Sequence, residues 1–110
     1  MNEIEIQNKI CEYLQSKGYL FWRSNNTPVF DKRLNSGYGA YRSQGKWAQP
    51  GLADIMIVLK EEYGQLCCLE VKTSKTKQSA DQKLFEKQCH LNNARYHVVR
   101  SVADVKALDL

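Results

Sequence analysis

The chain has 110 residues, enough for one compact domain and too few for two, so residues 1–110 are expected to form a single domain. Its net charge of +4 permits a polyanionic partner and is equally ordinary for a soluble protein. No apolar run is long enough to span a bilayer, and the acidic opening 1–5 lacks the pattern of a signal peptide. These features exclude a membrane protein and favour a cytoplasmic location.

The first quarter of the chain predicts a helix followed by a strand. Ile6, Ile10 and Leu14 recur at helical spacing within residues 3–17, and Gly18 follows as a stop. The aromatic run 19–22 predicts a short strand. From residue 25 to residue 50 the periodicity vanishes, which predicts a long loop of the kind that often carries function.

The remaining residues predict a hairpin, a helix, a strand and a terminal helix. Strands over 52–59 and 66–72 are separated by a short turn at 61–64, so they are expected to pair antiparallel. A capping box of Ser79 and Gln82 begins the next helix, which ends at residues 92–93. Its apolar side is expected at Ala80, Leu84, Phe85 and Cys89. A strand at 96–99 and a short helix capped by Ser101 complete the order α-β-loop-β-β-α-β-α.

The cysteines predict no metal site. Cys11, Cys67, Cys68 and Cys89 form no C-x-x-C pair, and the two histidines complete no zinc spacing. Reduced and partly buried thiols are the expected state.

Three ionisable residues interrupt one face of the predicted hairpin, whose two faces are otherwise mostly apolar. Glu70 and Lys72 are two residues apart and so point the same way, and a turn centred on Glu62 would place Asp54 opposite Glu70. Two carboxylates this close repel each other unless they share a divalent cation, and oxygen ligands suit Mg²⁺ or Mn²⁺. The alternative is a surface ion-pair cluster, which would contribute little to folding stability. The apolar neighbours favour a functional site, because buried charges need a partner or a metal.

This pattern resembles the D…(D/E)-X-K signature of the PD-(D/E)XK nucleases, and more narrowly the stand-alone VRR-NUC domains of bacteriophage and bacterial proteins. The similarity lies in segments spread over nearly the whole chain: residues 3–7, Gly51-Leu52-Ala53-Asp54, Leu69-Glu70-Val71-Lys72, Gln82 and Val98-Val99-Arg100-Ser101. Ala53 is a departure, since the family usually has proline there. The resemblance implies a restriction-endonuclease-like α/β core of order αβββαβα, with a mixed central sheet flanked by helices.

The resemblance also implies roles for individual residues. Asp54, Glu70 and the backbone carbonyl of Val71 would hold Mg²⁺ or Mn²⁺, and Lys72 would position the attacking water. Gln82 would lie close to the site, although its capping role competes. Gln7 or Glu3 would approach from the first helix, with a solvated helix face as the alternative for both.

Basic residues near this site are candidates for phosphate contacts. The set is Arg23, Lys32, Arg33, Arg42 and Lys46 in or beside the long loop, and Lys75 and Lys77 after the E-x-K strand. An ordinary solvated face is the alternative for the lysines. Tyr38, Tyr41 and Trp47 could stack on unpaired bases, although Trp47 is expected rather to pack locally and hold the loop down.

By resemblance, the expected activity is metal-dependent hydrolysis of phosphodiesters in branched DNA, with a Holliday junction as the favoured substrate. Resolving a junction takes two symmetric cuts, so a homodimer is expected. Other hypotheses are a nuclease of the same chemistry that cuts flaps or nicks, a metal-free nucleic-acid-binding module, and a purely structural domain.

Overall fold

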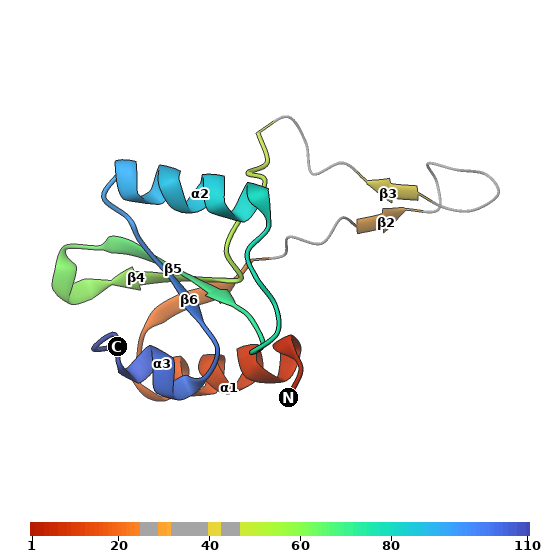
Figure 1. Ribbon diagram of the computed structural model, residues 1–110. Coiled ribbons are helices and arrows are strands. Elements are labelled where there is room, and N and C mark those ends of the chain that lie inside the picture. The colour runs from red at the N-terminus through yellow and green to blue at the C-terminus, as the bar shows by residue number, and fades with distance from the viewer. Residues whose placement is uncertain (25–28, 32–39, 43–46) are drawn as a thin grey trace.

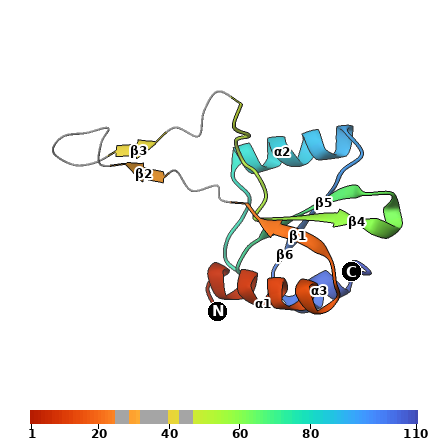
Figure 2. The same ribbon diagram turned by 180° about the vertical axis from the view of Figure 1, so that it is seen from behind.

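A four-stranded mixed sheet lies between helices in the computed structural model, which describes residues 1–24, 29–31, 40–42 and 47–110 (Figure 1). In chain order the helices and strands are α1 Glu3–Ser16, β1 Leu20–Arg23, β2 Val29–Asp31, β3 Ala40–Arg42, β4 Ile55–Leu59, the 3-10 turn η2 Lys60–Glu62, β5 Gln65–Val71, α2 Ala80–Leu91, β6 Arg95–Val99 and α3 Val102–Lys106. Helix α2 covers one face of the sheet, and α1 and α3 cover the other (Figure 2).

The strand order in the sheet is β1-β4-β5-β6. The first three strands are antiparallel neighbours, and β6 runs parallel to β5. A parallel neighbour requires a crossover, which α2 provides. The expected mixed sheet flanked by helices is therefore confirmed. The long segment predicted as loop differs in one respect, since β2 and β3 pair there as a separate two-stranded sheet.

Both faces of the β4–β5 hairpin are covered, as the sequence predicted. On the side of α1 and α3, the inward residues of the hairpin pack with Ile10 and Leu14 of α1, which are fully buried. On the side of α2, Met56 and Cys68 pack with Phe85 of the helix. Full burial of a large apolar side chain contributes about 1.5–3 kcal/mol, so the two layers hold the sheet from both sides.

Helix α2 begins as predicted, with both halves of the Ser79–Gln82 capping box formed. Its predicted apolar side is only half correct. Phe85 and Cys89 are buried, whereas Leu84 is 62% exposed and Ala80 is exposed. The helix rests on the sheet through positions four residues apart, and Leu84 is turned away from that line.

Strand β4 begins at Ile55, three residues later than predicted. Gly51, with φ +71°, lies in the segment that leads into the strand. Asp54 therefore lies just before the strand rather than inside it, which matters for the site described below.

The four cysteines are free thiols, and only Cys11 is partly exposed. This agrees with the expected reduced state. Within the described ranges, no helix is both long and apolar enough to cross a membrane.

Candidate functional site

Asp54 and Glu70 meet across two neighbouring strands. Ile55 pairs with Leu69, so one step further along the same register places Asp54 opposite Glu70, as a turn centred on Glu62 predicts. The backbone N–H of Ser24 donates to the Asp54 carbonyl at 2.8 Å, so the backbone of Asp54 faces β1 and not β5. The Asp54–Glu70 pair is thus of the non-hydrogen-bonded kind, in which side chains approach most closely.

The Asp54 side chain also makes a contact that a backbone carbonyl would normally make. Its Oδ2 accepts the backbone N–H of Val71 at 2.8 Å. In an antiparallel strand the N–H and C=O of one residue point to the same side. The carbonyl of Val71 is therefore directed to the same edge as the Asp54 carboxylate.

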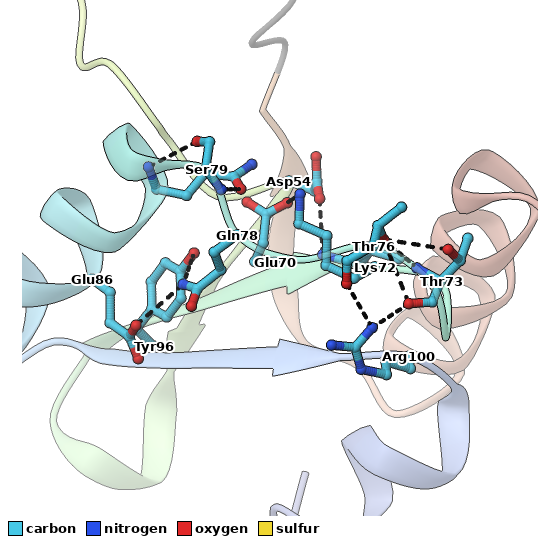
Figure 3. A network of polar contacts seen from close by, with 12 residues as sticks. Asp54, Glu70, Lys72, Thr73, Thr76, Gln78, Ser79, Glu86, Tyr96 and Arg100 are labelled. Carbon is cyan, nitrogen blue, oxygen red and sulfur yellow. Dashed lines mark hydrogen bonds and ion pairs between the residues drawn. The ribbon is translucent and has the colours of Figure 1, made fainter.

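Glu70 is almost completely buried, at 1% exposure, and Lys72 is buried beside it. Lys72 Nζ lies 3.8 Å from Glu70 Oε2, and the backbone N–H of Lys72 donates to the Val99 carbonyl of β6. Figure 3 shows the two carboxylates and the lysine amine converging at the end of β5. Glu70 Oε1 has no hydrogen-bond partner among the described residues.

The protonation of Glu70 follows from these surroundings. Burial raises the pKa of Glu70 well above its ordinary range, the adjacent Asp54 carboxyl raises it further, and Lys72 partly opposes both effects. Glu3 of α1 also contributes to raising the pKa. In the metal-free chain, burial and the Asp54 carboxyl therefore favour the protonated form of Glu70, and Lys72 only partly opposes this.

These residues fit a divalent cation. Within the described ranges, no cluster of three or more His, Cys, Asp and Glu side chains is placed to hold a metal. Two carboxylates and a main-chain carbonyl can nevertheless form an oxygen set of the kind that Mg²⁺ and Mn²⁺ accept, completed by water. The unpartnered Glu70 Oε1 is the buried oxygen that such a cation would satisfy.

Three helix residues were expected near the site: Gln82 of α2, and Gln7 or Glu3 of α1. Gln82 Oε1 accepts the backbone N–H of Ser79 at 2.8 Å, so the competing cap role is the one that the structure shows. Gln7 is 7% exposed, which contradicts the solvated-face alternative for that residue. Glu3 is half-buried and lies near enough to influence Glu70 electrostatically.

The candidate phosphate contacts are only partly visible. Arg23, Lys75 and Lys77 are exposed. Lys32, Arg33, Tyr38 and Lys46, and the side chains of Tyr41 and Arg42, lie outside the described part of the chain. The Trp47 side chain is 88% exposed, and most of the loop that it was expected to hold down lies outside the described residues.

Lys75 sits on a turn that is held from β6. Arg100 Nη1 donates to the carbonyls of Thr73 and Thr76, the latter at 3.1 Å, and the Thr73 N–H donates to Thr76 Oγ1 at 3.0 Å. These hydrogen bonds could not be predicted, because a single arginine at a strand end does not reveal its partners.

A second network, also drawn in Figure 3, lies further along the face that α2 covers. Gln78 Nε2 donates to Glu86 Oε1 at 3.1 Å and to the Tyr96 hydroxyl at 3.2 Å. These bonds connect the segment before α2 to the helix and to β6. Together with the bonds of Arg100, they hold the segment between Lys72 and Ser79 near both of its ends.

The packing of Gly51 was also hidden in the sequence. A Cβ at this residue would lie 2.2 Å from the Asp81 carbonyl oxygen, which is closer than any real contact. The start of α2 and the segment leading to Asp54 therefore touch backbone to backbone, which only glycine allows.

The described part of the chain is a four-stranded mixed sheet with α2 on one face and α1 and α3 on the other, and Asp54 and Glu70 lie opposite each other at one end of it. Among solved structures, one described as a VRR_NUC domain is similar over 97% of this chain and 92% of its own, with a TM-score of 0.64 and 20% identity. The chain thus has the fold of a VRR_NUC domain, as the resemblance implied. No family model and no curated protein matches the sequence.

Proposed function

We propose that this chain is a metal-dependent nuclease that hydrolyses phosphodiesters in DNA. The observation that carries the proposal is the pairing of Asp54 with the buried Glu70, whose Oε1 has no partner in the described structure, beside Lys72. The likeness to a VRR_NUC domain supports the same reading, since the arrangement lies on that fold.

Each residue of the site has a distinct task in this proposal. The carboxylates of Asp54 and Glu70 and the carbonyl of Val71 would hold Mg²⁺ or Mn²⁺. When bound, the cation would supply a more acidic water and a positive charge beside the scissile phosphate. The backbone N–H of Lys72 donates to the Val99 carbonyl, and its side-chain amine, 3.8 Å from Glu70 Oε2, would orient the attacking water. Lys75 and Lys77 bind the flanking phosphates without reading sequence.

We further propose that the substrate is branched DNA, with a four-way Holliday junction favoured and with two copies of the chain acting together. The described part of one chain carries one such site, and resolving a junction requires two symmetric cuts. A two-fold homodimer supplies both.

The test is cleavage by the purified protein of four labelled substrates: a four-way junction, a flap, a nicked duplex and a linear duplex. Each is incubated with Mg²⁺, with Mn²⁺ and with a chelator, while light scattering gives the oligomeric state. Paired symmetric nicks in the junction alone, by a dimer and only with metal, are the expected result. Cleavage of flaps or nicks instead would keep the chemistry and reject the junction.

Glu70→Gln separates the enzyme from a binding module. The variant should bind the junction and lose cleavage by at least about 10³-fold, because the amide cannot supply the second carboxylate. Glu12→Gln, on the exposed side of α1, is the matched control and should cleave normally. Wild-type protein that binds DNA but cuts none of the substrates would favour the non-catalytic module.

A further inference from the structure

Two side-chain atoms in the described part of the chain are buried without a hydrogen-bond partner, Ser24 Oγ and Glu70 Oε1. Buried polar atoms almost always have partners, so each exception calls for an explanation. Glu70 belongs to the proposed metal site. Ser24 has no role assigned above, and it directly follows Arg23, the last residue of β1.

The register of the sheet places both orphaned atoms in one row. Trp22 pairs with Met56, so Ser24 lies opposite Asp54, and the backbone hydrogen bond between these two residues confirms it. Asp54 in turn lies opposite Glu70. Ser24, Asp54 and Glu70 therefore follow one another across three adjacent strands.

The three side chains also share a face. Met56 and Cys68 belong to the core beneath α2. Asp54 is two residues from Met56, and Glu70 is two residues from Cys68, so both point to the α2 side. Ser24, directly opposite Asp54, points the same way.

We propose that the Ser24 hydroxyl is a substrate contact of the nuclease site, where it donates a hydrogen bond to a phosphate oxygen of the DNA strand. The inference rests on the proposed nuclease function and adds a residue to it. Asp54 and Glu70 offer only acceptors, and anionic oxygens repel a phosphate. Ser24 supplies a neutral donor at one end of the row, and Lys72 supplies a charged donor on the strand of Glu70.

A purely structural serine would behave differently on substitution. Its hydroxyl would bond within the protein, and its removal would lower stability. Here the hydroxyl has no bond within the described residues, so Ser24→Ala removes an unsatisfied buried group and should leave stability unchanged or increased.

The experiment compares junction cleavage and urea unfolding for wild type, Ser24→Ala and Ser24→Thr, all as full-length chains with Mg²⁺. Hydrogen bonds to charged groups are strong enough that Ser24→Ala should lower kcat/KM by about 10- to 100-fold. Ser24→Thr keeps the hydroxyl, so its kcat/KM should stay within a few-fold of wild type. Ser16→Ala is the control, because Ser16 bonds to the Tyr13 carbonyl at the far end of α1.

The outcomes separate the two proposals. Wild-type protein that cleaves while Ser24→Ala cleaves equally well would overturn the Ser24 contact and leave the nuclease in place. A Ser24→Ala variant that loses stability along with activity would show a structural serine and likewise overturn the contact. Wild-type protein that cuts no DNA under any condition would overturn both.

Discussion

Asp54 and Val71 are joined by a bond between a side chain and a backbone N–H, 2.8 Å from Oδ2 to nitrogen. The carboxylate thereby takes the place of the next β4 carbonyl and ends the antiparallel ladder at Ile55. A residue proposed to bind metal thus also decides where the strand begins.

Because Asp54 has both roles, we expect Asp54→Asn and Asp54→Ala to differ in folding stability although both lose activity. Asparagine keeps an acceptor for the Val71 N–H, so Asp54→Asn should unfold in urea close to wild type. Alanine leaves that N–H without its partner and should lose about 1–2 kcal/mol. Both variants should lose cleavage by about 10³-fold or more, because neither supplies a carboxylate. Equal stability of the two variants would show that the bond to Val71 contributes nothing.

The burial of Glu70 predicts a pH dependence of stability in metal-free buffer. The pKa of Glu70 is raised from 4.5 to about 9, first by burial and then by Asp54. Between these values the folded chain holds a proton that the unfolded chain releases, so folding stability should fall as pH rises through this window. Urea unfolding with chelator at steps from pH 5 to pH 9 measures the slope.

Glu70→Gln is the control for this slope, because the amide does not titrate. Its stability should vary less with pH than that of wild type, and it should exceed wild type most at the alkaline end. Parallel pH profiles for the two proteins would mean that Glu70 is ionised in the metal-free fold.

Gly51 and Gly18 have similar backbone conformations but different surroundings, so alanine substitutions at the two positions can be compared directly. Both have positive φ, +71° and +79°, but a Cβ at Gly18 meets nothing within 4 Å, whereas at Gly51 it would overlap the Asp81 backbone. Gly18→Ala should therefore cost about 1–2 kcal/mol from backbone strain alone. Gly51→Ala should cost clearly more and reduce cleavage, because the segment carrying Asp54 must move. Similar unfolding midpoints for both variants would contradict the close packing.

Lys75 is expected to contact a phosphate group of the DNA backbone. Lys75→Ala should weaken DNA binding and reduce the slope of log K against log salt by about 0.9, as for one lost contact on duplex DNA. Lys60→Ala, on the turn η2 at the opposite end of the hairpin, is the control and should leave the slope unchanged. DNA binding of both variants, measured by fluorescence anisotropy across a salt series, gives the two slopes.

Arg100 is predicted to hold the turn that carries Lys75. Arg100→Lys keeps the charge, but its side chain is one atom shorter, so the lysine amine cannot occupy the position from which Arg100 Nη1 donates to both the Thr73 and Thr76 carbonyls. Binding should weaken about two- to tenfold with an unchanged salt slope, because geometry and not charge is lost. A change in slope would indicate instead that Arg100 itself contacts phosphate.

Much of the central arrangement could be predicted because it depends on local rules. The register that pairs Asp54 with Glu70 follows from strand alternation and the short turn, and the α2 cap follows from Ser79 and Gln82. The late start of β4 could not be foreseen, since it depends on the Asp54 side chain reaching Val71.

Contacts between distant segments explain the other omissions. The fit of Gly51 against Asp81 and the hold of Arg100 on Thr76 join residues at least 24 positions apart, with no pattern in the sequence to announce them. Ser24 could have been found, because extending the same register by one strand places it beside Asp54.

The capping box has a consequence for what Gln82 can recognise. Its carbonyl oxygen is turned back to the Ser79 N–H, so the opposite half of the amide is the NH₂ group. That group donates and cannot ligate a cation. A partner of that NH₂ group must therefore offer lone pairs, as a sugar or phosphate oxygen does.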